Sequence, residues 1–99
     1  MEEKNCCHKT KVRSPEEYKA LTNRLSRIEG QVRGVKKMLD EDAYCVDILT
    51  QVSAIREALS AFSRELLSNH IHTCVAQDIR AGKNETVDEL VALLQKLMK

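Results

Sequence analysis

The sequence of 99 residues contains no tryptophan, and aromatic residues make up only 3% of it. A chain this short with so few large side chains has little material for a core of its own. With one proline and three glycines, little interrupts long helices. We therefore expect a small helical protein that completes its core by associating with further copies of itself.

The sequence also lacks any run that approaches the roughly 20 apolar residues of a membrane span. The first residues are charged, and no apolar segment follows them as it does in a secretory signal. We therefore expect a cytoplasmic protein with no membrane partner. In that compartment four cysteines favour metal binding or redox sensing over disulfides.

The net charge of +1 hides an uneven distribution along the chain. Residues 1–37 contain ten Lys and Arg against five acidic residues, and residues 38–99 contain six against ten. The basic part is suited to a polyanion such as nucleic acid, with an ordinary solvated helix surface as the alternative interpretation.

Residues 1–13 are polar and aperiodic, which predicts a flexible tail before a single helical domain over 14–99. Ser14 as N-cap, Pro15 at the first helical position and Glu17 three residues after the cap predict a helix start. Gly30 and Gly34 weaken this helix, which suggests that a neighbouring helix or a ligand backbone approaches it closely. Its apolar residues alternate three and four apart in a heptad pattern: Tyr18, Leu21, Leu25, Ile28, Val32, Val35 and Leu39.

Two further helices follow a polar break at residues 40–42. Residues 82–84 end the second helix or its extension, and Asn84 or Thr86 is the expected cap of the third. With no β pattern, the fold is predicted to be all-α, and two chains pairing antiparallel would form a four-helix bundle. The second helix has its own heptad pattern: Cys45, Ile48, Val52, Ile55, Leu59, Phe62, Leu66 and His70.

Cys45, His70 and Cys74 form a candidate metal site with soft ligands. His70 and Cys74 are four residues apart and so share a helix face, but Cys45 lies about 37 Å away along the same helix. If these residues form a site, an antiparallel second copy must supply Cys45. Three ligands without an obvious fourth favour Cu(I) over zinc. The alternative is two buried cysteines and a core histidine without a metal.

Other Cys and His residues carry weaker signals. His72 is off the face of His70 and is expected at the surface. Cys6, Cys7 and His8 form a second soft cluster that could capture or transfer a metal, with an exposed reactive tail as the alternative.

Three segments together closely resemble one protein family: Thr22–Gly34 (TNRLSRIEGQVRG), Tyr44–Leu49 (YCVDIL) and the His70–Cys74 pair. They are similar to the CsoR/RcnR family of metal-sensing repressors, in its copper-sensing branch. The resemblance implies a three-helix protomer, an antiparallel four-helix bundle dimer and a tetramer that is a dimer of dimers. It implies that the apo tetramer represses metal-efflux genes on its operator and that Cu(I) releases it. One Cu(I) per protomer would be shared across the dimer interface, held by Cys45 of one protomer and by His70 and Cys74 of the other.

The family also places a tyrosine and a glutamate behind the ligating histidine. Tyr44 matches the tyrosine, and Glu89 is the best match for the glutamate, with a capping box with Thr86 as its alternative role. Nickel and cobalt sensors of the family add a nitrogen ligand near the first helix. That position falls near Arg13, which cannot ligate a metal, although His8 is close in sequence.

No helix-turn-helix or zinc-finger pattern is present, so the basic first helix is the predicted DNA-binding surface. We expect phosphate contacts and shape readout with a steep salt dependence. A nickel or cobalt repressor, and a copper buffer or chaperone that uses Cys6, Cys7 and His8, stay open as alternatives. A copper chaperone is a candidate partner, and an enzyme is not expected. The predicted DNA-binding residues are Arg13, Arg24, Arg27, Arg33, Lys36 and Lys37.

Overall fold

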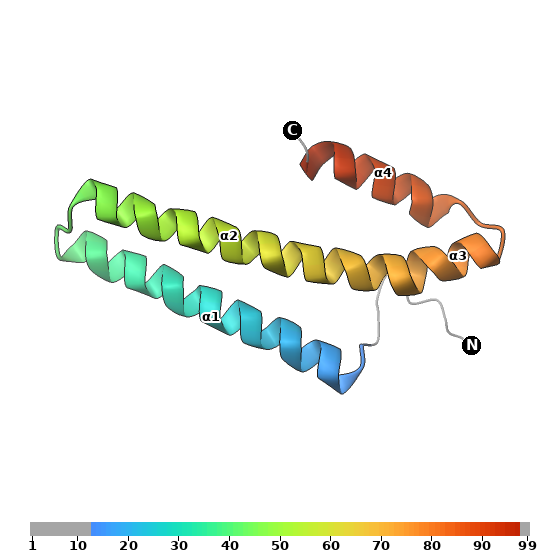
Figure 1. Cartoon of the computed structure of the whole chain (residues 1–99), viewed down its shortest axis with the longest axis horizontal. Coiled ribbons are helices and arrows are strands. Elements are labelled where there is room, and N and C mark those ends of the chain that lie inside the picture. The colour runs from blue at the N-terminus through green and yellow to red at the C-terminus, as the bar shows by residue number, and fades with distance from the viewer. Residues whose placement is uncertain (1–12, 98–99) are drawn as a thin grey trace. The chain divides into compact units, whose positions relative to one another are not determined.

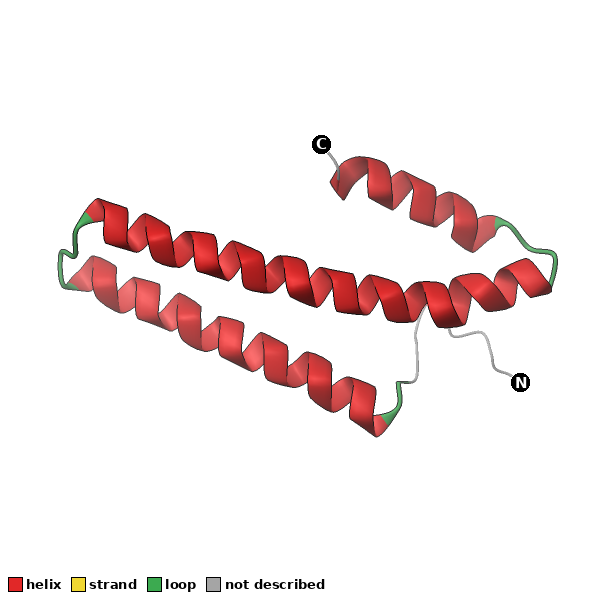
Figure 2. Cartoon of the chain, in the orientation of Figure 1, coloured by secondary structure: helices red, strands yellow, loops and turns green. Residues whose placement is uncertain are grey.

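The computed structural model describes residues 13–97, and every regular element in this range is helical (Figures 1 and 2). The helix α2 continues without a break through η2 and α3, so three helical stretches make up the described chain. This confirms the predicted all-α fold. None of the described helices is long and apolar enough to span a bilayer. The elements in chain order are α1 (Pro15–Asp40), α2 (Cys45–His70), η2 (Ile71–Val75), α3 (Ala76–Arg80) and α4 (Glu85–Leu97).

The first helix begins where its capping residues predict. Ser14 has extended backbone angles, its Oγ accepts a hydrogen bond of 3.1 Å from the Glu17 N–H, and Pro15 takes the first helical position. After the helix, Asp42 adopts a φ of 55°, which a short polar side chain tolerates better than most. The polar break predicted at residues 40–42 is therefore a tight turn at residues 41–42 that leads into α2, while Asp40 is still the last residue of α1.

Residues Arg13–Leu66 form one compact unit, in which α1 and α2 run antiparallel (Figure 1). On α1, Leu21 and Ile28 are buried and share a helix face with Arg24, whose guanidinium contacts Glu65 of α2. This face of α1 therefore packs against α2. Only some residues of the α1 heptad pattern are therefore buried in this packing.

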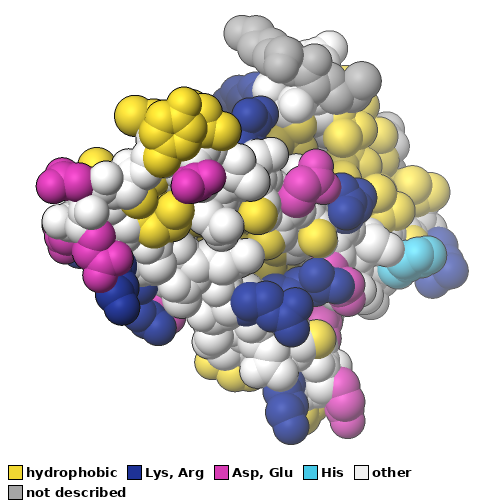
Figure 3. Space-filling model, turned by 60° about the vertical axis from the view of Figure 1, so that its left-hand side comes forward, with side chains coloured by type: hydrophobic (Ala, Val, Ile, Leu, Met, Phe, Trp, Pro, Cys, Tyr) yellow, Lys and Arg dark blue, Asp and Glu magenta, His cyan; other side chains and the backbone are white. Residues whose placement is uncertain are grey.

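The other part of the heptad pattern is open to solvent. On α1, four apolar residues spaced seven apart are exposed. Their exposed fractions are 64% for Tyr18, 45% for Leu25, 44% for Val32 and 67% for Leu39. Figure 3, in which the α1–α2 turn comes forward, shows hydrophobic side chains at the surface. We call Tyr18, Leu25, Val32 and Leu39 the α1 stripe. An apolar stripe this long at heptad spacing is typical of a helix that packs against a further helix.

The second unit contains the chain from Leu67 onwards, including η2, α3 and α4. Gly82 has a φ of 78°, its N–H donates to the Ile79 carbonyl at 3.1 Å, and the Lys83 N–H donates to the Asp78 carbonyl at 2.8 Å. These two bonds form a Schellman motif, which requires the left-handed residue that glycine supplies. The predicted helix end at residues 82–84 is thus confirmed.

Of the two residues predicted as the cap of the third helix, Asn84 holds the cap position. Asn84 directly precedes α4, and its carbonyl accepts the Asp88 N–H at 3.0 Å. Thr86 is the second residue inside α4 and is fully buried, so it is not the cap. Its Oγ1 has no hydrogen-bond partner among the described residues, which also removes the capping-box role that pairs Glu89 with Thr86.

Candidate metal centre

His70 and Cys74 lie on a segment that departs from the regular α-helix assumed from the sequence. His70 is the last residue of α2, and η2 is a π-helical turn in which the Ala76 N–H donates to the carbonyl of Ile71, five residues back. The Thr73 hydroxyl donates to the Asn69 carbonyl at 2.8 Å, a back-bond that perturbs helix geometry. Single π turns inside α-helices are frequently found at functional sites.

Cys74 is buried, with 1% of its surface exposed, and its thiol is not in a disulfide. The Thr73 Oγ1 lies 3.6 Å from its Sγ. In the described part of the unit from Leu67 onwards, the other buried side chains are Val75, Asp78 and Thr86. Cys74 is therefore part of a small core between the end of the long helical stretch and α4, where a metal would be shielded from water.

Cys45 has the opposite environment. It is the first residue of α2, its thiol is free, and its side chain is exposed. It begins a second heptad set with Val52 and Leu59, whose exposed fractions are 37% and 44%. We call Cys45, Val52 and Leu59 the α2 stripe. Cys45, the first residue of the heptad pattern predicted for the second helix, therefore faces solvent in the protomer.

One chain does not bring the three ligands together. Cys45 and His70 are the first and last residues of α2, and 25 residues of α-helix span about 37 Å. Within residues 13–97, no three His, Cys, Asp or Glu side chains are close enough to hold a metal ion. The donor set nevertheless fits a soft ion, because neither cysteine is in a disulfide and His70 supplies an imidazole.

The two residues predicted to lie behind the ligating histidine, Tyr44 and Glu89, belong to different compact units. Tyr44 immediately precedes α2 and is 69% exposed, and its carbonyl accepts the N–H groups of Asp47 and Ile48. Glu89 is an exposed residue of α4. Neither side chain makes a hydrogen bond within the described residues. Their predicted role behind His70 stays a prediction.

The predicted DNA-binding residues, on α1 and just before it, are mostly exposed. Arg13 is half-buried, with its Nε 3.5 Å from an Oε of Glu17. Nothing within the described chain lies within 4 Å of a Cβ placed on Gly34, and on Gly30 only the Arg33 side chain would, at 3.7 Å. No neighbouring helix among residues 13–97 therefore explains the two glycines. The exposed basic residues are Arg24, Arg27, Arg33, Lys36 and Lys37.

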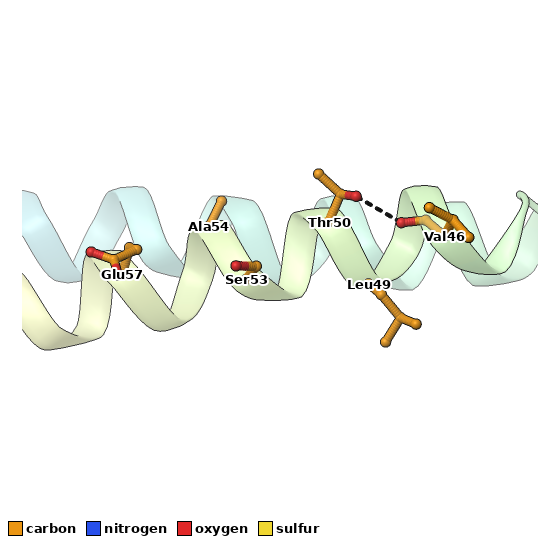
Figure 4. Close-up of a pocket in the computed structure, with 6 residues that line it drawn as sticks. All are labelled: Val46, Leu49, Thr50, Ser53, Ala54 and Glu57. Carbon is orange, nitrogen blue, oxygen red and sulfur yellow. Dashed lines mark hydrogen bonds between the residues drawn. The ribbon is translucent and has the colours of Figure 1, made fainter.

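A shallow hollow runs along one side of α2 (Figure 4). At its wall, the Thr50 hydroxyl donates a hydrogen bond of 2.8 Å to the Val46 carbonyl. The hollow contains neither a cysteine nor a histidine. Six residues line it: Val46, Leu49, Thr50, Ser53, Ala54 and Glu57.

Comparison with known proteins shows the family. Residues 17–96 match the family described as metal-sensitive transcriptional repressor. The chain belongs to this family. It is 46% identical over 99 residues to the copper-sensing transcriptional repressor CsoR of Bacillus subtilis, covering 98% of both chains. This confirms the resemblance noted in the sequence and the expectation that the protein is not an enzyme.

Solved structures of the family have the same fold. The Cu(I)-bound CsoR of Geobacillus thermodenitrificans matches with a TM-score of 0.85 and 45% identity, covering 89% of this chain and 93% of that one. The nickel-responsive regulator InrS matches with a TM-score of 0.70 and 41% identity, covering 86% of this chain and 97% of that one. The family thus contains sensors of different metals at similar identity to this repressor.

Sequence reasoning missed three features of this centre. The π turn of η2, the buried Asp78 and the buried Thr86 were not predicted. A signal for the first was present, because Thr73 follows Asn69 by four residues and its hydroxyl can bond the carbonyl there. The other two depend on how α4 packs, which the heptad pattern does not specify.

Proposed function

We propose that this protein is a Cu(I)-responsive repressor that binds operator DNA without metal and leaves it when Cu(I) binds. The observation that carries the proposal is the soft donor set of Cys45, His70 and Cys74 in a chain that resembles copper-sensing repressors over nearly its whole length. Its targets would be genes of copper efflux or resistance, and it would act in the cytoplasm.

The metal centre we propose holds one Cu(I) per protomer, with Cys45 from one protomer and His70 and Cys74 from its partner. The α1 and α2 stripes support this arrangement, because both leave apolar surface open in the protomer. Pairing two hairpins antiparallel through these stripes forms a four-helix bundle. Since Cys45 belongs to the α2 stripe, the same pairing carries Cys45 into the dimer interface.

Two further residues are proposed to support the ligating histidine. Tyr44 precedes Cys45, so it would arrive at the centre together with the partner's thiolate. Glu89 is on α4, which contacts η2. A hydrogen bond to the second imidazole nitrogen of His70 would fix its tautomer and link metal binding to the position of α4.

The DNA surface is proposed to be the exposed basic face of α1, repeated four times in a dimer of dimers. Arg27, Arg33, Lys36 and Lys37 are exposed and make no ion pair within the described residues. Repeated basic faces without a groove-reading element favour phosphate contacts and steep salt dependence. Gly30 and Gly34 would let the DNA backbone come close to this face.

The test is an anaerobic titration of Cu(I) against the repressor bound to DNA from its own upstream region, followed by fluorescence anisotropy. We expect one Cu(I) per protomer to weaken DNA binding by about 5- to 150-fold, the usual range of allosteric coupling. Unchanged DNA affinity at full Cu(I) occupancy would contradict the proposal. A parallel Ni(II) titration tests the alternative that the protein responds to nickel, as the structurally similar regulator InrS does.

The cluster of Cys6, Cys7 and His8 lies outside the described residues, and so does the evidence for a buffer or chaperone role.

A further inference from the structure

Asp78 is the only charged side chain that is buried among residues 13–97, with 7% of its surface exposed. Its Oδ2 has no hydrogen-bond partner within this range. Burying a carboxylate without a partner costs free energy, so proteins rarely retain such a group where an apolar residue would serve. We therefore expect the charge of Asp78 to have a function.

The position of Asp78 places that charge near the proposed metal. Asp78 lies in α3, four residues after Cys74 of the π turn. Side chains about one helical turn apart are neighbours, and in a regular α-helix they lie about 5–6 Å apart at Cβ. Both residues are buried in the same small core. The other charged residues of α3, α4 and the turn between them are exposed to water, which screens their charges: Arg80, Lys83, Glu85, Asp88, Glu89 and Lys96.

We propose that Asp78 is a specificity-determining residue, which sets how strongly the centre discriminates between monovalent and divalent ions. The inference rests on the metal centre proposed above, because it takes Cys74 as a ligand. By Coulomb's law, a carboxylate at a given distance attracts a divalent ion twice as strongly as a monovalent one. Asp78 therefore favours divalent ions, against the preference for Cu(I) that the two thiolates create.

A quantitative prediction about ratios follows from the charge difference. Asp78→Asn removes the charge and keeps the size of the side chain. If Cu(I) affinity falls by some factor, the affinity for a divalent ion falls by about the square of that factor. We expect Cu(I) affinity to fall about tenfold and Zn(II) affinity to fall about a hundredfold, so selectivity for Cu(I) over Zn(II) rises about tenfold.

The experiment measures both affinities on the full chain by competition with chromophoric chelators, under anaerobic conditions. Thr86→Val is the matched control, because it removes the other buried oxygen without a partner in the described part of this core but changes no charge. The Cu(I)-to-Zn(II) affinity ratio should stay within about threefold of wild type in Thr86→Val and in the charge-conserving Asp78→Glu.

The possible outcomes distinguish a wrong role for Asp78 from a wrong metal centre. An Asp78→Asn variant that loses both affinities by the same factor, as disturbed packing would cause, overturns it. So does a variant with both affinities unchanged. If the chain binds Cu(I) equally well after Cys74→Ala, the proposed centre itself is wrong, which the Asp78 ratio alone would not reveal. A ratio that changes only in Asp78→Asn supports the inference.

Discussion

Arg24 of α1 lies against Glu65 of α2, with 3.6 Å between its Nη2 and the carboxylate Oε1. Both side chains are about 40% exposed, so the contact adds little to stability. The contact matters instead for DNA binding, because it occupies the Arg24 guanidinium. A basic residue proposed to meet phosphate already has a partner inside its own protomer, whereas Arg27 has none within the described residues.

The first prediction therefore compares Arg24→Ala with Arg27→Ala. Each phosphate contact contributes about 0.9 to the slope of log affinity against log salt concentration. We expect Arg27→Ala to reduce this slope by about one unit for each phosphate that its side chain neutralises, and Arg24→Ala to reduce it by less. Anisotropy titrations at several salt concentrations measure both slopes. An equal reduction in the two variants would show that the Glu65 carboxylate does not restrain Arg24.

The second prediction concerns Gly34, where a methyl group placed at the Cβ position would have nothing within 4 Å in the described chain. Gly34→Ala should stabilise the helix by about 0.5–1 kcal/mol, seen as a higher Tm. It should also weaken DNA binding, because the added methyl group meets the approaching DNA backbone. Ser60→Ala, an exposed change on α2, should leave DNA binding unaltered. Higher stability with unchanged DNA affinity would mean that DNA does not approach Gly34.

The third prediction concerns the α2 stripe. Val52→Glu places a charge where two protomers are proposed to pair, and burying it unpaired is costly. We expect monomers by analytical ultracentrifugation, together with loss of Cu(I) binding. Ala54→Glu adds the same charge about half a turn around α2, in the hollow of Figure 4, and should leave the dimer intact. Dissociation by Ala54→Glu and not by Val52→Glu would place the interface on the hollow instead.

Much of the fold was predictable because its signals are local. Ser14 and Pro15 define the start of α1, and Gly82 supplies the left-handed residue at the end of α3. The π turn was not predictable from the four-residue spacing of His70 and Cys74, because periodicity assumes a regular helix. The heptad pattern also could not show which of its residues the protomer buries.

The candidate site was predictable as a set of ligands and less so as an environment. The residue types of Cys45, His70 and Cys74 indicate a soft metal by themselves. That Cys45 is exposed while Cys74 is buried depends on tertiary packing, as does the burial of Asp78. These environments follow from which parts of the long helical stretch its neighbouring helices cover, which no local pattern encodes.

The central claim is that each metal centre takes ligands from two protomers. A dimer with one Cys45→Ala chain and one His70→Ala chain tests it directly. The two chains carry different tags, so that mixed dimers can be purified and titrated anaerobically with Cu(I). If the ligands come from both protomers, each mixed dimer retains one intact centre and binds one Cu(I), although neither variant alone binds at such a centre. Mixed dimers that bind no Cu(I) would contradict the account.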